Sequence, residues 1–301
     1  MLNIIGNRFK LLLAGIAALL VSVILLVVFG LKPGLEFTSG TMFTLRFEEQ
    51  TELSVADVRS AMNDLGYANA VVQSTSRGDF QIRISLAEND EVSQIENKLA
   101  EKYGKVTREG ITKVEPTISH QTVRATLIAI IAASIGMLLY ITFAFRRMPN
   151  PFQYGACAII TLIWDLTMVI GTFALIAGIA DWEINLMFIT GLLSVIGYSV
   201  NDKIVMFDRI RENKRRSVST NFSTLANVSV VESINRSLLT SVSTMLAVLA
   251  LMFFVGSSIK TFLMVLLLGI IYGTYSSIFF CVPFLTVWEN REWGKIFSFG
   301  K

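Results

Sequence analysis

The run LLLAGIAALLVSVILLVVF occupies residues 11–29 and contains no charged side chain. A helix of about 20 apolar residues is long enough to cross the roughly 30 Å apolar core of a bilayer. Arg8 and Lys10 precede the run, as they would in a signal peptide, but the run is longer than a signal peptide needs. No cleavage site of small residues follows before Lys32. The stretch therefore predicts a retained membrane anchor.

Five further apolar runs of similar length follow, and the composition agrees with them. Hydrophobic residues make up 53% of the chain and charged residues 16%, against about 25% charged in an average soluble protein. The six predicted spans are 11–29, 125–145, 154–178, 186–207, 238–255 and 262–282. The sequence thus predicts a polytopic α-helical membrane protein with six transmembrane helices.

Residues 31–124, between the first two spans, have the composition of a soluble domain, with 11 basic and 14 acidic residues. Alternating patterns predict strands at 41–47, 70–75, 80–86 and 105–114. Two helical patterns interrupt them, one opened by Ser54 with a capping-box spacing and ended by Gly66, the other ended by Gly104. The order β-α-β-β-α-β predicts a ferredoxin-like α+β domain.

Short basic loops set the expected orientation, because positive charge stays on the cytoplasmic side. Arg8 and Lys10, Arg146 and Arg147, and the run from Arg209 to Arg216 all fall on one side. The prediction is a cytoplasmic N-terminus with the first span at 1–30, an exported domain at 31–124, a bundle at 125–288 and a cytoplasmic tail at 289–301. In a bacterium this corresponds to the inner membrane.

Several classes of function are disfavoured by the scarcity of reactive side chains. The chain has one histidine, His120, and two cysteines, Cys157 and Cys281, which are too few for a zinc site, a disulfide framework or a cysteine nucleophile with a histidine base. It has no G-x-S-x-G motif. The net charge of +3 does not favour a nucleic-acid partner. We expect neither enzymatic activity nor a cofactor or metal.

Ionisable residues within spans cost at least ~2.5 to 3.5 kcal/mol, so each one is a candidate functional residue. The candidates are Asp165 in the third span, Asp202 in the fourth and Arg236 just before the fifth. Each belongs to a polar helix face. The supporting polar residues are Ser194, Tyr198 and Asn201 on the fourth helix and Thr240 on the fifth.

Structural roles remain open for the same residues. Asp165 would serve equally as a static hydrogen-bonding carboxyl, and Arg236 as a charge that anchors its helix at the cytoplasmic interface. Asp208 and Arg209 fit a hinge or a subunit contact, or simply a solvated helix end. Small residues spaced four apart favour close helix packing at two places, Ala132 with Gly136 in the second span and Gly269 with Gly273 and Ser277 in the sixth.

Two motifs connect the chain with a known family. The stretch GYSVNDKIVMFDRIREN at 197–213 resembles the fourth-helix signature of the SecF branch of the SecD/SecF protein-export family, and GLEFTSG at 34–40 resembles its entry motif. Arg236 with Thr240 resembles the start of the family's fifth helix. The chain differs from the family's usual pattern at three places. Ser39 stands where the entry motif usually has glycine, and Lys203 stands where a small hydroxyl residue is usual. Residues 115–118 stand where a Gly-Pro pair usually leads into the second span.

The resemblance implies an auxiliary subunit of the Sec translocase that uses an ion gradient to promote preprotein export. Its implied partners are SecD, completing a twelve-helix unit, the SecYEG channel, the preprotein and membrane lipid, with YajC as a further candidate. The coupling ion is expected to be H⁺, with Na⁺ as the alternative. In the resulting hypothesis Asp202 takes up and releases a proton, Arg236 is its counter-ion, and Asp165 is a second relay or a structural partner.

Half of a small-molecule exporter of the resistance-nodulation-division type is the nearest alternative, because it would share the intramembrane carboxylate. A single domain of this size leaves little room for a substrate-binding porter. An intramembrane enzyme is disfavoured, because the sequence has none of the motifs of such enzymes. A purely structural scaffold would leave the charges of Asp165, Asp202 and Arg236 unexplained.

Overall fold

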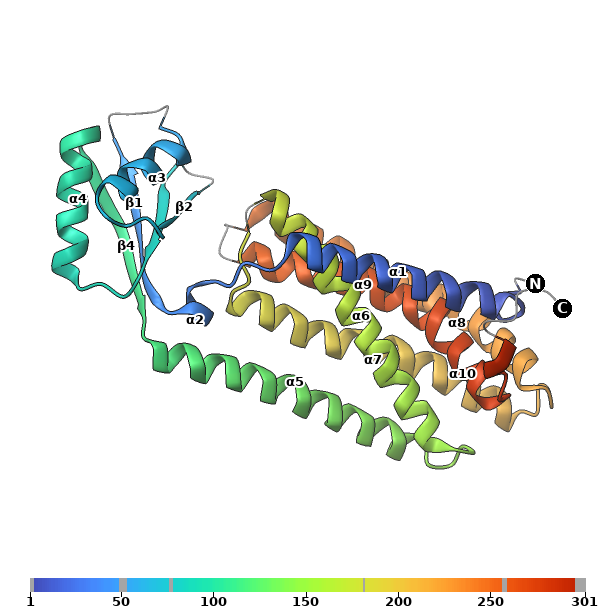
Figure 1. Ribbon diagram of the computed structural model, residues 1–301. Helices are drawn as coiled ribbons and strands as arrows, with labels where there is room; N and C mark the ends of the chain where they lie inside the picture. The colour runs from blue at the N-terminus through green and yellow to red at the C-terminus, as the bar shows by residue number, and fades with distance from the viewer. Residues whose placement is uncertain (1–2, 49–52, 76–77, 181, 256–258, 296–301) are drawn as a thin grey trace. The chain divides into compact units, whose positions relative to one another are not determined.

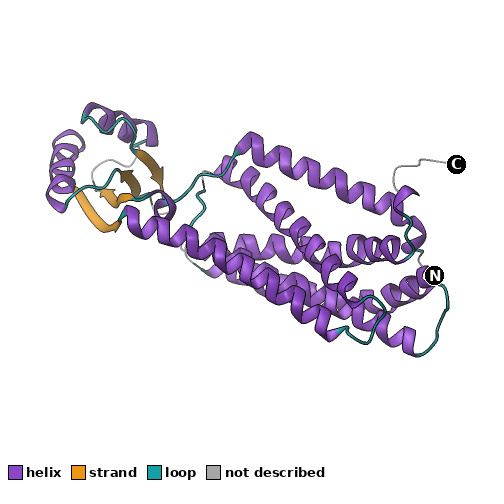
Figure 2. Ribbon diagram, turned by 60° about the horizontal axis from the view of Figure 1, so that its bottom comes forward, coloured by secondary structure: helices purple, strands orange, loops and turns teal. Residues whose placement is uncertain are grey.

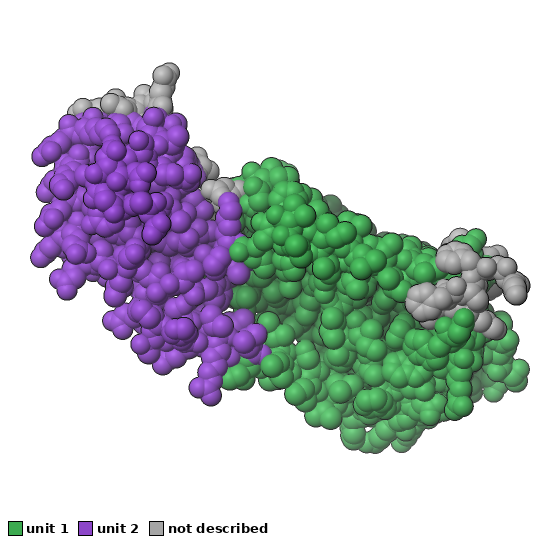
Figure 3. Space-filling model, viewed as in Figure 1, with its two compact units in different colours: residues 1–31, 128–182, 187–301 green, residues 32–127, 183–186 purple. Residues whose placement is uncertain are grey.

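The computed structural model describes residues 3–48, 53–75, 78–180, 182–255 and 259–295. Part of the predicted cytoplasmic tail, residues 296–301, lies outside these ranges. The chain forms two compact units, shown in different colours in Figure 3. Unit 1 comprises residues 1–31, 128–182 and 187–301, and unit 2 comprises residues 32–127 and 183–186.

Unit 2 contains a four-stranded antiparallel sheet with two helices (Figure 2). The strands lie in the order β2-β3-β1-β4, so β1 pairs with both β3 and β4. The elements are α2 (Leu35–Thr38), β1 (Gly40–Phe47), α3 (Val55–Asp64), β2 (Val71–Ser74), β3 (Phe80–Ile84), α4 (Asn89–Tyr103) and β4 (Val106–Val114). All four predicted strands and both predicted helices are present, with the expected order. The single turn α2 was not expected.

Local sequence accounts for the boundaries of α3. Ser54 Oγ accepts the backbone N–H of Asp57 at 3.2 Å, and the Asp57 carboxylate accepts the Ser54 N–H at 3.0 Å. These two bonds form the predicted capping box. The hydrogen bonds from Ser54 also hold the pKa of Asp57 below its usual value. After the helix, Gly66 has φ +93°, a conformation that glycine adopts without strain.

The core of unit 2 lies between the sheet and its helices. Inward residues of the strands, including Phe43, Leu45 and Ile82, are fully buried against Val58 and Leu99 of α3 and α4. Burial of a large apolar side chain contributes about 1.5–3 kcal/mol. The alternation of apolar and polar residues along the strands therefore places the core where the sequence predicts it.

The segment that connects α6 to α7 belongs to unit 2. Ile184 pairs with Pro33 in a parallel β-bridge, and its N–H donates to the Lys32 carbonyl at 2.9 Å. Arg83, on β3, donates to the Glu183 carboxylate at 2.9 Å and to the Pro33 carbonyl at 3.0 Å. Residues 183–186 are thus held to the domain by backbone and side-chain bonds.

Unit 1 is a bundle of long helices (Figure 1). Its elements are η1 (Ile5–Asn7), α1 (Arg8–Phe29), α5 (Pro116–Ala144), α6 (Pro151–Ala180), α7 (Leu186–Arg215), α8 (Phe222–Phe254), α9 (Lys260–Ser276), the π-helical turn η3 (Ser277–Cys281), α10 (Val282–Glu289) and η4 (Trp293–Lys295). The first turns of α5 and the first residue of α7 fall within unit 2. The predicted sixth span is divided by η3, which the sequence does not reveal.

Five helical segments within the described residues are long and apolar enough to cross a membrane. They are Ile5–Phe29, Pro116–Ala144, Pro151–Ala180, Phe222–Phe254 and Lys260–Glu289. The predicted fourth span, within α7, is not among them, because Asn201, Asp202 and Lys203 reduce its apolar character. The protein is therefore a membrane protein with at least five apolar helices.

Small residues allow α9 to approach α7 closely. A Cβ added to Gly269 would lie 2.0 Å from a methyl group of Val195, and one added to Gly273 would lie 3.2 Å from the backbone of Ser199. The two glycines therefore serve the packing that the sequence predicts. The close packing predicted at Gly136 on α5 is not present in the described part of the chain, since no atom of another helix lies within 4 Å of a Cβ added there.

Gly269→Ala is expected to separate α7 from α9 and to cost about 1–3 kcal/mol of unfolding free energy, because the added methyl group overpacks a tight contact. Thermal unfolding in detergent measures the loss. Gly136→Ala is the matched control and should leave the unfolding midpoint unchanged, and equal losses in the two variants would contradict this account.

Candidate functional site

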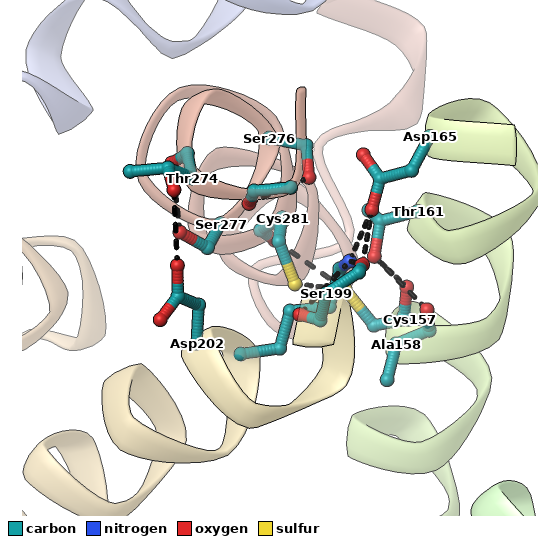
Figure 4. A network of polar contacts seen from close by, with 12 residues as sticks. Cys157, Ala158, Thr161, Asp165, Ser199, Asp202, Thr274, Ser276, Ser277 and Cys281 are labelled. Carbon is teal, nitrogen blue, oxygen red and sulfur yellow. Dashed lines mark hydrogen bonds and ion pairs between the residues drawn. The ribbon is translucent and has the colours of Figure 1, made fainter. Parts of the chain in front are cut away.

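Asp202 on α7 is buried, with 2% of its surface exposed. Its Oδ2 accepts from Thr274 Oγ1 of α9 at 3.2 Å and from Ser241 Oγ of α8 at 3.4 Å. Those two hydroxyls lie 2.6 Å apart, and Tyr198 OH donates to Ser241 at 3.0 Å. Figure 4 shows Asp202 directed toward Thr274. One carboxylate thus connects three helices through neutral hydroxyl groups.

Asp165 on α6 occupies a second polar cluster. Lys203 Nζ lies 2.5 Å from its Oδ2, and both side chains are fully buried. Ser199, one turn before Lys203 on α7, donates to the same Oδ2 and accepts from the ammonium. The ion pair therefore has additional hydrogen bonds, which a buried pair needs to offset the loss of solvation.

The two clusters lie on different sides of α7, as Figure 4 shows. Asp202 and Lys203 are adjacent in sequence, and successive helix positions point about 100° apart because a turn holds 3.6 residues. Lys203 consequently pairs with Asp165 on α6, whereas Asp202 faces α8 and α9. The helix α7 thus directs Lys203 toward α6 and Asp202 toward α8 and α9.

Arg236 on α8 lies apart from Asp202 in the structure. Its side chain is exposed, and no ion pair joins it to Asp202 in the described ranges. Ser237 and Ser241, both buried, form the face of α8 that approaches Asp202, and Arg236 lies about 100° around the helix from Ser237. Thr240 is also exposed, and its hydroxyl donates to the Arg236 carbonyl at 2.9 Å.

The remaining predicted residues lie at the margins of the two clusters. Asn201 is exposed, and Ser194 is partly buried with its hydroxyl donating to the Thr190 carbonyl at 2.9 Å. Asp208 pairs with Arg211 on the same helix. Arg209 Nε lies 2.9 Å from Glu232 of α8, so this residue joins α7 to α8 near the end of α7.

Sequence analysis missed Ser199, Thr274 and the role of Lys203. The spacing of four between Ser199 and Lys203 was available as a signal, since it places both on one face of a helix. Thr274 gave no signal, because single threonines within spans commonly bond to their own helix. Its neighbour in the sequence, the π-helical turn η3, is the kind of irregularity that is frequent at functional sites.

The two cysteines are also close to this region. Their sulfur atoms lie 3.6 Å apart, and both thiols are free and buried. Among the described residues no group of three His, Cys, Asp or Glu side chains is arranged to bind a metal ion.

Family models match most of the chain. One for the protein export membrane protein SecD/SecF, C-terminal, matches residues 94–291, and one for the SecD/SecF GG motif matches residues 24–51. Among similar proteins, the protein translocase subunit SecF of Thermobaculum terrenum is 38% identical, covering 99% of this chain and 97% of the relative. The SecF subunit of Anaerolinea thermophila is 35% identical, covering 100% and 98%.

Solved structures are similar over nearly the whole chain. The crystal structure of SecDF from Thermus thermophilus, described as a translocon-associated membrane protein, superposes with a TM-score of 0.83 at 29% identity over 96% of this chain. SecDF in a super-membrane-facing form gives a TM-score of 0.66 at 26% identity over 98%. The chain spans only 39% of the length of each SecDF chain.

Proposed function

Since the chain belongs to the SecD/SecF family of protein-export membrane proteins, as a SecF-type subunit, we propose that it couples an ion gradient to preprotein export as an auxiliary subunit of the Sec translocase. The observation that carries the proposal is the Asp202 carboxylate, 2% exposed between three membrane helices and bonded to hydroxyl groups. Burying a carboxylate is costly, so such a group is retained where it has a function.

Asp202 alternates between a charged and a protonated state in this proposal. Thr274 and Ser241 donate to the carboxylate when it is charged, and can accept from it when it is protonated, because hydroxyl groups act in both senses. Protonation therefore changes the bonds between α7, α8 and α9. A charge that crosses the membrane field is worth ~2.3 kcal/mol per 100 mV, which is comparable to the 1–3 kcal/mol of typical allosteric coupling.

The finer architecture follows the same proposal. We place α7 as a sixth span, since its 30 residues are long enough to cross a bilayer, its first half is apolar, and Asp202 and Lys203 face neighbouring helices. The strand order β2-β3-β1-β4 with two intervening helices supports a ferredoxin-like class for the domain. The basic loops favour cytoplasmic termini and an exported domain in the bacterial inner membrane.

Exposed helix faces favour a partner subunit within the membrane. Of the residues in the most apolar stretch of α5, only 6% are buried within this chain, and the corresponding share in α8 is 17%. Arg236 and Thr240 lie exposed on α8, where lipid would penalise a charge. SecD is the partner that these faces fit best, given that the similar SecDF chains extend beyond the part matched here. Contacts with SecYEG, YajC and the preprotein would use other surfaces.

Reconstitution provides the test. Proteoliposomes containing the channel, a SecD-type subunit and this chain should translocate a preprotein faster when an ion gradient is imposed, and vesicles that lack the chain should lose this stimulation. Equal rates with and without the chain would refute the proposal. A drug-dependent ion flux through this chain alone would favour the small-molecule exporter, which the similar proteins do not support.

Arg236 acts as counter-ion only after α8 has moved or SecD has bound, because it faces away from Asp202 in this chain alone. Arg236→Ala is therefore expected to leave the unfolding midpoint of the isolated chain unchanged and to reduce ion-dependent export. Thermal unfolding and the reconstituted assay measure the two effects. A large loss of stability in the isolated chain would instead indicate that the arginine already has a buried partner.

A further inference from the structure

The ammonium group of Lys203 lies among oxygen atoms contributed by two helices. Asp165 Oδ2 is 2.5 Å away, the Ser199 hydroxyl accepts from it, and the Ser199 carbonyl accepts at 3.4 Å. The side chains of Lys203 and Asp165 are both inaccessible to solvent. The hydrogen-bond acceptors of Nζ are thus a carboxylate, a hydroxyl and a backbone carbonyl.

A fourth oxygen is available in the same place. Asp165 Oδ1 is buried and has no hydrogen-bond partner in the described part of the chain. The hydroxyl of Thr161, one turn earlier on α6, donates to the Cys157 carbonyl at 2.9 Å. Carboxylate, hydroxyl and carbonyl oxygens are the ligands that hard metal cations prefer.

We propose that this oxygen cluster is a monovalent-cation site that the Lys203 ammonium occupies as a tethered cation, so that Lys203 excludes Na⁺ from the cluster. The inference goes beyond the proposed function, because it concerns the cluster at Asp165 and not the coupling carboxylate Asp202. The site itself stands on the contacts of Lys203, Asp165 and Ser199.

Charge balance explains how a small residue at position 203 would change the site. Removal of the ammonium leaves the Asp165 carboxylate buried without a counter-charge, which is strongly unfavourable. A free cation that enters the vacated volume restores the balance. Serine or threonine at this position would also supply a further hydroxyl oxygen. Lys203→Ser therefore converts a site filled by the protein into one that binds Na⁺.

Thermal unfolding of the purified full-length chain tests this proposal. The midpoint is measured in NaCl, KCl and choline chloride at equal ionic strength. The wild-type midpoint should not depend on the cation. Lys203→Ser should unfold at lower temperature in choline chloride and recover about 5 °C or more in saturating NaCl, as expected for a ligand at about 100 times its dissociation constant.

Two variants separate cation binding from loss of charge. Lys203→Met removes the charge but keeps the volume filled, so its midpoint should fall and should not recover in NaCl. Lys203→Ser combined with Asp165→Asn should also lose the response to Na⁺. Lys10→Ser, at an exposed lysine of α1, is the matched control and should behave as wild type.

Three outcomes would overturn the proposal: a wild-type midpoint that rises with Na⁺, a Lys203→Ser midpoint that is the same in all three salts, or recovery of Lys203→Met in NaCl. If Lys203→Ser cannot be purified in choline chloride, recovery of folded protein in NaCl supports the site, and failure in both salts refutes it.

The unfolding measurement does not depend on preprotein export. A Na⁺ response of Lys203→Ser, together with an absence of gradient-driven export in the reconstituted assay, would support the site and refute the proposed function. Gradient-driven export without a Na⁺ response of Lys203→Ser would support the proposed function and refute the site.

Discussion

Replacement of Asp202 by asparagine is expected to abolish the stimulation of preprotein export by an ion gradient. The amide has nearly the same shape and keeps hydrogen bonds to Thr274 and Ser241, but it cannot take up or release a proton. The chain should therefore fold and assemble with its partner while gradient-driven export falls to the rate seen without a gradient. Export into proteoliposomes, with and without an imposed gradient, measures the difference.

Two controls make this result interpretable. Asp64→Asn removes a carboxylate that is 66% exposed in the domain and should leave stimulation intact. Co-purification with a SecD-type subunit reports assembly of the Asp202→Asn variant. Normal stimulation by Asp202→Asn would eliminate this residue as the coupling carboxylate, and loss of assembly would show that its role is structural.

Disruption of the buried ion pair should have the largest effect on stability. Asp165→Leu leaves the Lys203 ammonium buried without a counter-ion. Lys203→Met likewise leaves the Asp165 carboxylate buried without a counter-ion. Either change is expected to reduce the free energy of unfolding by about 3–5 kcal/mol. Combining the two replaces the pair by apolar side chains of similar size, and most of the lost stability should return.

A double-mutant cycle in detergent quantifies this coupling between Asp165 and Lys203. The exposed pair of Lys102 and Asp64, with 50% and 66% of its side chains accessible, is the control and should give no measurable coupling. If the losses for Asp165→Leu and Lys203→Met simply add in the double variant, the two groups do not interact as an ion pair in the membrane.

Local patterns were sufficient to predict the soluble unit. The alternation in β1 and β3 and the capping box at Ser54 are properties of short segments, and each one matches the structure within a residue or two. The apolar runs likewise predict long helices. Helix ends were less accurate, since α8 begins at Phe222 rather than near Leu238. Glu232, Asn235 and Arg236 interrupt the apolar residues of its first turns, so no continuous apolar run marks this part of the helix.

The candidate site was only partly predictable. Asp165 and Asp202 stand out because charges are rare in apolar runs, and both are buried in the bundle. Their partners depend on how α6, α7, α8 and α9 are rotated about their axes, which no single sequence reveals. Lys203 follows Asp202 directly in the sequence, and its pairing with Asp165 on another helix is visible only in the structure.

The bridge between Ile184 and Pro33 leaves little chain between the domain and α7. Only one residue separates this bridge from the first residue of α7 at Leu186, and Asp202 lies 16 residues further on, about 24 Å along a helix. The chain between the β-bridge and α7 therefore has only two backbone dihedrals that belong to neither element, those of Asn185.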